Sequence, residues 1–465
     1  MNDAGLLKEF SAVCGTDHCF TAADNRAMRH RLIFTTLTDT DPGFRIVVQP
    51  ATLEELQDCV RAVRRLGLAL WWTYNAAGNG AVRSADPDPG VVLDLQRMNR
   101  IVDIDSASAT ALVEPGVSYA QLHSHLRANA PELWTDPDRC GGNSVAGSIT
   151  ARHIGYTAYG DHLQMQCGME LVQADGELLR TGMGALPGSD TWQVFKYNFG
   201  PYLDGLFTRS DFAVVSKIGL WLMSRPPEYR PFRVTLPDGQ AFNQAVELLR
   251  PLKFSNVIPS TVVLSSHELD EALRGRGAAA GPWTLSAALY GTPENVAETW
   301  SLIKPGLLVI PEALISGADD HPGDLVWQER RGLMSGIPGI RESDLGGYGG
   351  DYCGRLTVAL PIDGNAAGAL NKLTRMVLAA QRRDYLAEYL VSGRVMFKQI
   401  YLPCPGDNRK AAQDTLTTAR ILIDALAGAG HHIVDESLAF TPLVDVHYRN
   451  NTLAGYTAKL RNALR

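Results

Sequence analysis

Two glycine-containing stretches are the segments of this chain best suited to bind an anion. The first, WWTYNAAGNGAVRS, covers residues 71–84 and places Gly78 and Gly80 between two expected strands. The second, PDRCGGNSVAGSITARHIGYTAYGDH, covers residues 137–162 and includes an expected helix start at Val145. Glycine lets the backbone approach a ligand closely, and consecutive N–H groups can form a concave anion site. Alone, each stretch would more often be an ordinary turn, so the surrounding sequence has to decide.

Other residue patterns with known chemistry are weak. His123 and His125 are two residues apart and point to different faces of a helix. His431 and His432 lack acidic or thiol neighbours at ligand spacing. The sequence contains neither a G-x-S-x-G string nor a P-loop lysine motif. We therefore expect no metal site.

The composition is that of an ordinary soluble globular protein. Of the 465 residues, 45% are hydrophobic and 20% are charged, and the net charge is -7. Because no basic run is present, nucleic acid and anionic membrane surfaces are poor partners. The seven cysteines are scattered without a C-x-x-C, and the N-terminus MNDAGLLKEF lacks the features of a signal peptide. We expect a cytoplasmic protein with a small-molecule substrate.

The first half of the chain alternates between helix and strand patterns. Residues 52–67 begin with Thr52 and carry Glu55 three residues later, which predicts a helix with a capping box. Residues 68–72, LALWW, predict a buried strand, and residues 169–182 predict a hairpin turned at Asp-Gly. A strand pattern, VVSKIGLWLM, ends this half of the chain.

The second half is built from longer helices. Helix patterns cover residues 243–252, 293–302, 366–382 and 409–429, and strand patterns lie between them. This arrangement predicts an α+β layer. The proline-rich segment Ser224 to Pro231 interrupts the pattern between the halves and reads as a linker.

Three long strings resemble one family of flavoproteins. They are GYTAYGDH, LLRTGMGALP and FGPYLDGLFTRSDFAVVSKIG, and their order and spacing resemble the family of vanillyl-alcohol oxidase and the 4-cresol methylhydroxylase flavoprotein subunit. The similarity is close from Ile46 to about Met223 and looser beyond. It implies an α+β fold, with an FAD-binding domain of the 4-cresol methylhydroxylase type (PCMH-type). This domain has two α/β subdomains, and an α+β cap domain follows it. We expect the FAD-binding domain over residues 1–223, the cap over 232–430, and a C-terminal segment, 431–465, that returns toward the FAD domain.

The resemblance also implies where FAD binds. The stretch 76–80 occupies the position of the pyrophosphate loop, although relatives usually read Gly-Arg-Asn-x-Gly there and this chain has no arginine. We expect the loop shape to be kept and its anion affinity to be lower. The second glycine run matches a segment that lies beside the phosphates and the flavin in relatives. The strand near residue 214 matches the strand that holds the adenine end of FAD in relatives. The residues expected to contact FAD are Ala76, Ala77, Gly78, Asn79, Gly80, Gly141, Gly142, Asn143, Ser144, Gly147, Ala213 and Val215.

The positions that bind substrate in the family differ in this chain. Phenol oxidases of the family hold a phenolate with a tyrosine after the pyrophosphate loop, where this chain has Ala81. Their Tyr-Arg pair before a Leu-Ala-Phe string corresponds to Val434 and Asp435. Counting back from the GYT string places Arg139 where some members have an aspartate near the flavin, with Asp136 and Asp138 close by if the alignment slips. Tyr156, the tyrosine of GYT, keeps its identity.

These departures change the expected chemistry. A phenolate needs positive charge and hydroxyl donors, because an unpaired charge in a closed pocket costs several kcal/mol. A 4-hydroxybenzylic substrate held as its phenolate is therefore not expected. Because the aspartate and arginine positions have exchanged signs, we predict an ion pair between Arg139 and Asp435 near Tyr156, and these three are the candidate catalytic residues. The alternative is that the alignment slips and both charged side chains face water.

The covalent flavin link of relatives comes from a histidine or tyrosine five residues before a proline-aliphatic pair. Counting back from Pro361 gives Leu356, which cannot form the bond, so we expect non-covalent FAD, with Tyr352 and Cys353 as the nearest reactive alternatives. The sequence ends at LRNALR without the Asp-Pro-Asn-Gly segment that returns to the flavin in relatives. Either the flavin site is weaker or another segment fills the gap.

Two classes of function follow. The first is an FAD-dependent oxidoreductase with non-covalent flavin that oxidises a small organic substrate. The second is a flavin-free or redox-inactive family member that acts as a cyclase or lyase in a biosynthetic pathway, or as a partner subunit. A visible flavin spectrum distinguishes the two classes. By analogy with relatives, we expect a homodimer.

Overall fold

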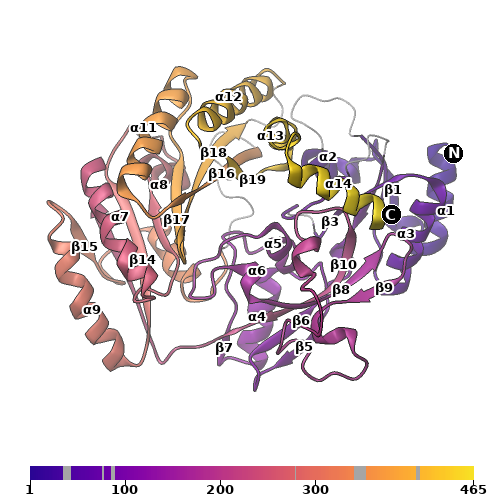
Figure 1. Ribbon diagram of the computed structural model, residues 1–465, viewed down its shortest axis with the longest axis horizontal. Helices are drawn as coiled ribbons and strands as arrows, with labels where there is room; N and C mark the ends of the chain where they lie inside the picture. The colour runs from indigo at the N-terminus through magenta and orange to yellow at the C-terminus, as the bar shows by residue number, and fades with distance from the viewer. Residues whose placement is uncertain are drawn as a thin grey trace.

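The computed structural model describes residues 1–34, 43–75, 78–84, 90–277, 279–339, 352–404 and 409–464. Within this part of the chain the strands form three large sheets and one two-stranded pair. Two of the sheets belong to the first half of the chain and the third to the second half, and Figure 1 shows the halves side by side. None of the described helices is long and apolar enough to cross a membrane.

The first sheet has the strand order β1-β2-β4-β3. β2 and β3 both pair in parallel with β4, and helix α3 is the crossover between β2 and β3. β1 pairs with β2 antiparallel. The strands are β1 (Cys19–Thr21), β2 (Phe44–Val48), β3 (Ala69–Thr73) and β4 (Gly90–Asp94), and the helices beside them are α1 (Asp3–Cys14), α2 (Met28–Phe34) and α3 (Leu53–Leu66).

The second sheet is antiparallel with the order β5-β6-β10-β8-β9. The first and second sheets share one hydrophobic core with α3 and α4, so they bury their apolar faces together. The strands are β5 (Ile101–Asp105), β6 (Thr110–Val113), β8 (Gln166–Gln173), β9 (Leu178–Arg180) and β10 (Ala213–Trp221); the helices are α4 (Tyr119–Asn129), α5 (Val145–Ala151) and α6 (His162–Met165).

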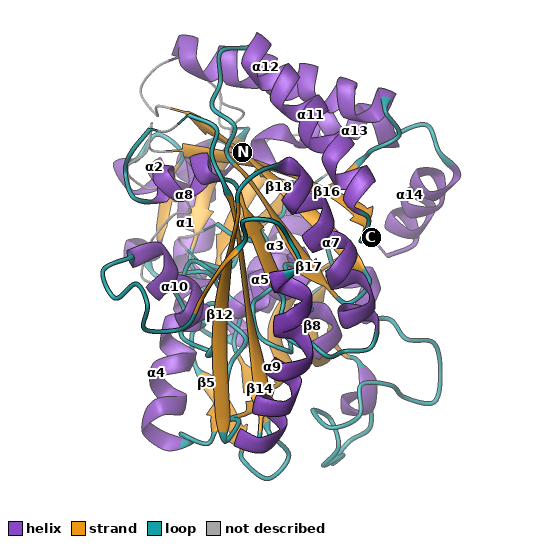
Figure 2. Ribbon diagram, turned by 90° about the vertical axis from the view of Figure 1, so that its left-hand side faces the viewer, coloured by secondary structure: helices purple, strands orange, loops and turns teal. Residues whose placement is uncertain are grey.

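The third sheet has eight strands in the order β15-β12-β14-β13-β17-β18-β16-β19, all paired antiparallel. Long helices cover its outer face, as Figure 2 shows, and share its core. The strands are β12 (Glu228–Leu236), β13 (Val262–Ser265), β14 (Trp283–Gly291), β15 (Leu314–Ser316), β16 (Tyr352–Pro361), β17 (Ala387–Ser392), β18 (Val395–Cys404) and β19 (Ile433–Glu436). The helices are α7 (Gly239–Phe254), α8 (His267–Leu273), α9 (Pro293–Leu308), α10 (Leu325–Leu333), α11 (Gly364–Ala380) and α12 (Arg409–Gly428).

The two halves are joined by a short connection and by the end of the chain. The strands β7 (Leu133–Trp134) and β11 (Met223–Ser224) pair just before the chain enters β12, which already includes Pro231 of the expected linker. After β19, helices α13 (Thr441–Tyr448) and α14 (Thr452–Leu464) run back across the first half, as the yellow end of the chain in Figure 1 shows. The exact domain limits stay a prediction, although β19 belongs to the third sheet and the return begins only after it.

The local signals of the sequence correspond to real capping and turn interactions. Thr52 accepts a hydrogen bond from the backbone N–H of Glu55, and the Glu55 carboxylate accepts one from the N–H of Ala51. Both bonds use donors that a helix start leaves without partners. The predicted hairpin is β8–β9, with Gly176 at φ 80 in its turn. The expected helix start at Val145 is confirmed, with Ser144 as its N-cap.

Candidate active site and cofactor cleft

A cavity of about 260 Å³ lies between the first half of the chain and the inner face of the third sheet. The three predicted catalytic residues Tyr156, Arg139 and Asp435 all line it. Besides β19, which carries Asp435, three strands of the sheet contribute residues to which the sequence assigned no role. The strand residues are Arg355, Thr357, Leu390, Phe397, Gln399 and Tyr401.

Strand alternation explains which side chains reach the cavity. Successive side chains in a strand point to opposite faces of the sheet. In β16, Arg355 and Thr357 face the cavity, whereas Leu356 and Val358 pack into the core beneath the helices. In β17, Leu390 faces the cavity for the same reason, two residues after Glu388.

Arg139 forms a buried ion pair with Glu388, not with Asp435. One guanidinium nitrogen of Arg139 donates to both Glu388 carboxylate oxygens at 2.8 Å, and the two side chains are 4% and 0% exposed. The hydroxyl of Tyr401 donates to the same carboxylate at 2.8 Å. The predicted Arg139–Asp435 pair is therefore wrong. Counting from one motif placed both residues in the cavity, but the carboxylate nearest to Arg139 comes from a strand that the count did not include.

Asp435 is held by two other arginines. Its carboxylate accepts from Arg209 at 2.5 Å and from Arg355 at 2.8 Å, and Arg209 also pairs with Glu436 at 2.7 Å. Burial by itself raises the pKa of Asp435, but the nearby charges of Arg355 and Arg209 hold the pKa below its ordinary value. Asp435 therefore remains a carboxylate in the wall of the cavity.

The sequence assigned no role to His153, which lies in the cavity wall beside Asp138. His153 Nδ1 is 3.0 Å from Asp138 Oδ2, and its Nε2 is 3.1 Å from a guanidinium nitrogen of Arg355. Because arginine can only donate, Nε2 must accept, and the ring proton therefore lies on Nδ1 and is donated to Asp138. Burial raises the pKa of Asp138, yet the hydrogen bonds from His153 and Ser148 help to outweigh burial, and the pKa is lowered strongly. The pair is a carboxylate that orients a neutral imidazole.

The feature of the sequence that could have identified Asp138 as a cavity residue was its proximity to the GYT string. The count of residues placed Arg139 in the family's aspartate position, and a slip of one residue places Asp138 there instead. Asp136, the other neighbouring carboxylate, accepts from the N–H groups of Tyr156 and Thr157 and from His162, so it holds the chain after α5 in place. Asp138, not Asp136, is the carboxylate that lines the cavity.

A chain of hydrogen bonds links the cavity to the first glycine loop. Asn79 donates to Ser148 Oγ at 3.0 Å, and Ser148 donates to Asp138 at 2.7 Å. Asn79 also accepts from the N–H of Ser144 at 2.9 Å, at the start of α5. The loop and α5 approach so closely that a Cβ on Gly80 would lie 2.4 Å from the carbonyl oxygen of Gly147. Only glycine fits at this contact.

The first loop has the features of an anion site. Gly78 and Gly80 have φ values of 76 and 68, in the region that favours glycine. Within the described residues, the N–H groups of Asn79, Gly80 and Gly142 have no hydrogen-bond acceptor in the protein. Free N–H groups of this kind can receive a phosphate. Ala76 and Ala77, also expected in this loop, lie outside the described residues.

The second glycine run serves mainly to hold the protein together. Gly141 donates to the carbonyl of Gly339, Asn143 donates to Cys140, and the Gly142 carbonyl accepts from Asn75. Ser144 and Gly147 form the N-cap of α5, with Ser144 Oγ accepting from the Gly147 N–H at 3.0 Å. Most of these polar groups therefore have partners within the chain.

The two residues expected at the adenine end, Ala213 and Val215, lie in different surroundings. Ala213 lines a second cavity, of about 250 Å³, between the first two sheets. Val215 is completely buried in the core that these sheets share, so its side chain does not reach that cavity.

Comparison with known proteins assigns the family. A profile described as an FAD binding domain matches residues 44–182. The chain is 32% identical over 420 residues to the 4-cresol dehydrogenase [hydroxylating] flavoprotein subunit of Pseudomonas putida, across 84% of this chain and 80% of that protein. This chain belongs to the vanillyl-alcohol oxidase and 4-cresol methylhydroxylase flavoprotein family. It is a flavin-dependent oxidoreductase, and FAD is its cofactor.

A solved structure and a second sequence relative show how far the similarity extends. A solved structure of p-cresol methylhydroxylase with substrate bound superimposes with a TM-score of 0.90 at 27% identity, covering 99% of this chain and 94% of that chain. The 1'-carboxy-chondrochloren decarboxylase of Chondromyces crocatus is 30% identical over 300 residues, which are 62% of this chain and 52% of that protein. The expected PCMH-type α+β fold is confirmed.

The residues of this family member fit FAD at the loop. The free N–H groups of Asn79 and Gly80 suit the pyrophosphate, and Ala213 faces the second cavity. Where relatives carry the linking residue, Leu356 is completely buried and faces the helices, away from the cavity. Cys353 packs against a separate cluster that includes Tyr401, and the side chain of Tyr352 lies outside the described residues.

Proposed function

We propose that this flavoprotein oxidises a hydroxyl-bearing carbon of a small substrate that also carries a negative charge. The observation that supports the proposal most directly is the Asp138–His153 pair in the wall of a cavity with several arginines. The substrate would lie in that cavity, beside the hydrogen-bond chain to the glycine loop.

The negative charge of the substrate is inferred from Arg152. Each of the other three arginines that line the cavity pairs with a carboxylate. Among the residues that the structure describes, Arg152 bonds only to Thr208, through Oγ1 at 2.9 Å and the carbonyl oxygen at 3.5 Å. Its side chain is exposed at the cavity wall. A guanidinium without a carboxylate partner can bind a substrate carboxylate in a bidentate manner.

The proton of the substrate hydroxyl would go to His153. Nε2 of His153 accepts a hydrogen bond from Arg355. A substrate hydroxyl in the place of Arg355 would donate to the same nitrogen, and Asp138 orients the ring for this contact. FAD supplies the acceptor for the hydride that leaves the carbon. Loss of the hydroxyl proton to His153, together with loss of that hydride, would convert the alcohol carbon into a carbonyl carbon.

Phenolate binding is poorly supported by this pocket. Arg139 lies 3.5 Å from the Tyr401 hydroxyl, and Glu388 already compensates the charge of Arg139 at 2.8 Å. A phenolate beside this pair would meet a carboxylate in a closed space, which is costly. Cresol-type substrates, which the names of two relatives indicate for those proteins, are therefore not our proposal here.

Decarboxylation is the second candidate. One relative, by its name, removes a carboxyl group, and an unpaired arginine suits a substrate that carries one. Release of carbon dioxide in place of a carbonyl product would favour this function.

A substrate panel tests the proposal. The holoprotein would be mixed without oxygen with 2-hydroxy acids, neutral alcohols of matched size and 4-alkylphenols, and the visible flavin absorption would be followed. We expect hydroxy acids to bleach the flavin fastest. Faster reduction by neutral alcohols or alkylphenols would contradict the proposal, and carbon dioxide would be measured in the same samples.

The role of Arg152 gives a specific prediction. Replacing Arg152 by alanine is expected to raise KM for the charged substrate about tenfold or more, because one charge-assisted interaction is lost. Arg152→Lys, which keeps the charge, is expected to recover part of the affinity. An equal change in KM for a neutral alcohol would show that the effect is not electrostatic.

The non-covalent cofactor is a separate prediction. Because Leu356 faces the core and cannot bond to flavin, acid precipitation of the holoprotein is expected to leave the flavin in the supernatant. Flavin that remains in the pellet would locate a covalent link at another residue, and peptide mapping would identify it.

A further inference from the structure

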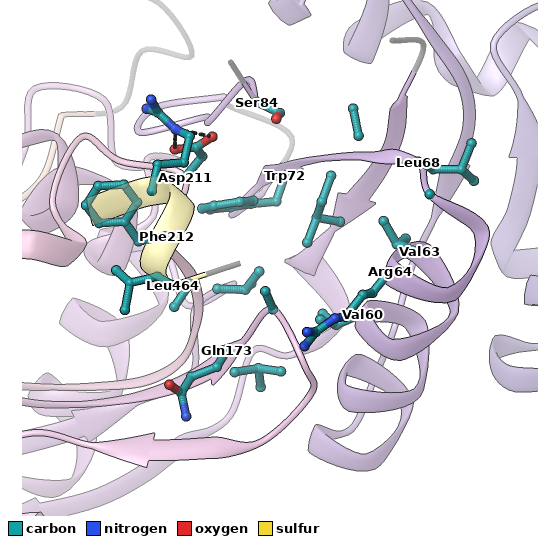
Figure 3. Close-up of a pocket in the computed structure, with 18 residues that line it drawn as sticks. Val60, Val63, Arg64, Leu68, Trp72, Ser84, Gln173, Asp211, Phe212 and Leu464 are labelled. Carbon is teal, nitrogen blue, oxygen red and sulfur yellow. Dashed lines mark hydrogen bonds and ion pairs between the residues drawn. The ribbon is translucent and has the colours of Figure 1, made fainter. Parts of the chain in front are cut away.

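The C-terminal helix forms part of the wall of the second cavity. This cavity lies between the edge strand β3 and the start of β10, and Figure 3 shows Trp72 between the α3 side and the Phe212 side. Leu464, from the last described turn of α14, lies on the Phe212 side. The C-terminal helix therefore helps to close a space formed by residues about 250 to 400 positions earlier in the chain.

A small number of contacts hold α14 at this place. Arg461 Nε donates to the Asp211 carboxylate at 2.9 and 3.2 Å, and its guanidinium carbon lies 5.7 Å from the centre of the Phe212 ring. Leu460 packs against the core shared by the first two sheets. No residue of α14 is fully buried. A helix with so few contacts is held locally and can move away without unfolding the core.

The shape and lining of the cavity suit one end of an elongated ligand. Its volume of about 250 Å³ is below the usual range for a whole bound cofactor, which begins at about 300 Å³. Flat apolar walls come from Trp72 and Phe212, which suit an aromatic ring system. Ser84 lines the same cavity and lies four residues after Gly80, whose N–H is free to receive a phosphate.

We propose that α14 is a clasp over the adenosine end of FAD, and that Arg461 fastens it. The cofactor would extend from this cavity, past the N–H groups of Asn79 and Gly80, toward the cavity with Asp138 and His153. The Arg461–Asp211 contact holds the clasp closed, so it sets how fast FAD leaves the protein. The inference rests on FAD binding and is independent of the substrate proposed above.

The Arg461 contact is better placed than an ordinary surface pair. Asp211 is 5% exposed and Arg461 is 25% exposed, so solvent screens their interaction only in part. The guanidinium also lies near an aromatic ring, which adds a cation–π contribution. Breaking both interactions is expected to speed the release of FAD about tenfold, which corresponds to about 1.4 kcal/mol.

The experiment compares FAD release from matched arginine variants. Holoprotein would be diluted into an excess of a flavin-binding competitor, and the change in flavin fluorescence as FAD is transferred would be followed for wild type, Arg461→Ala, Arg461→Lys and Arg449→Ala. Arg449 pairs with Asp445 on α13 at 3.3 Å with both side chains more than half exposed, so it is the matched control. We expect faster release from Arg461→Ala, an intermediate rate from Arg461→Lys and no change from Arg449→Ala.

Removal of residues 452–465 gives the second measurement. The shortened protein is expected to release FAD at least as fast as Arg461→Ala, while the melting temperatures of the FAD-free proteins stay close to each other. Release from Arg461→Ala at the wild-type rate would overturn the proposal. Equal losses of melting temperature with and without FAD would also overturn it, because the helix would then stabilise the fold and not the bound cofactor. If the shortened protein does not fold, the three arginine variants decide alone.

Discussion

Replacing His153 by alanine is expected to slow the reduction of FAD by substrate by a factor of about 100 to 10,000, the usual contribution of a general base. The variant loses the imidazole that Asp138 orients in the cavity wall. Asp138→Asn is expected to have a smaller effect, since the amide can still bond to the ring while its negative charge is lost. The rate would be measured by stopped-flow absorption without oxygen, with the best substrate from the panel.

The same experiment has a matched control. His431 lies outside both cavities, so His431→Ala is expected to leave the rate unchanged. FAD binding is expected to stay near the wild-type value in all three variants, because the free N–H groups at Asn79 and Gly80 are not altered. If His153→Ala reduced the flavin at the wild-type rate, another group would have to accept the substrate proton.

Replacing Arg139 by alanine is expected to lower the free energy of unfolding by about 3–5 kcal/mol. The change leaves the completely buried Glu388 carboxylate without its guanidinium partner, and within the described residues Tyr401 is then its remaining hydrogen-bond donor. A buried charge without a partner carries a large desolvation cost. Urea unfolding of the protein, followed by tryptophan fluorescence, would measure the loss.

A double variant separates the charge from the packing. Arg139→Met combined with Glu388→Leu is expected to recover most of the lost stability, because two apolar side chains of similar size need no counter-charge. Arg61, which pairs with Asp58 on the exposed face of α3, is the control, and Arg61→Ala is expected to cost less than about 1 kcal/mol. Additive losses in the Arg139 and Glu388 variants would contradict the paired arrangement.

The Arg139–Glu388 pair also connects the two halves of the molecule. Arg139 lies in the segment before α5, and Glu388 lies on β17 of the third sheet. A shift of either segment would separate the charges, so the pair favours one position of the sheet over the cavity. The same position brings Arg355 of β16 to His153.

Local features of the protein could be predicted because each depends on neighbouring residues. The Thr52 cap, the hairpin of β8 and β9 and the start of α5 are set by side chains within a few positions of the backbone groups that they satisfy. The glycine loop was also recognisable, since its backbone needs φ values that favour glycine. The family and the fold followed from long ordered strings in the first half of the chain.

The charge pairs could not be predicted in the same way. Counting from a motif placed Arg139, Tyr156 and Asp435 in one cavity, but it could not name Glu388 as the partner of Arg139 or Arg209 and Arg355 as the partners of Asp435. A shift of one residue in a strand reverses the face of a side chain, and these partners come from β17, β16 and the chain before β10.

The sequence by itself therefore determined the family and located the glycine loop proposed to bind FAD, because these depend on the identity of residues in order. Only the tertiary structure decided that Asp138 and His153 form a pair, that Arg152 has no carboxylate partner in the described part of the chain, and that α14 helps to close the second cavity. These depend on which faces of distant strands and helices meet. The packing of the three sheets fixes those contacts, and no local pattern in the chain encodes them.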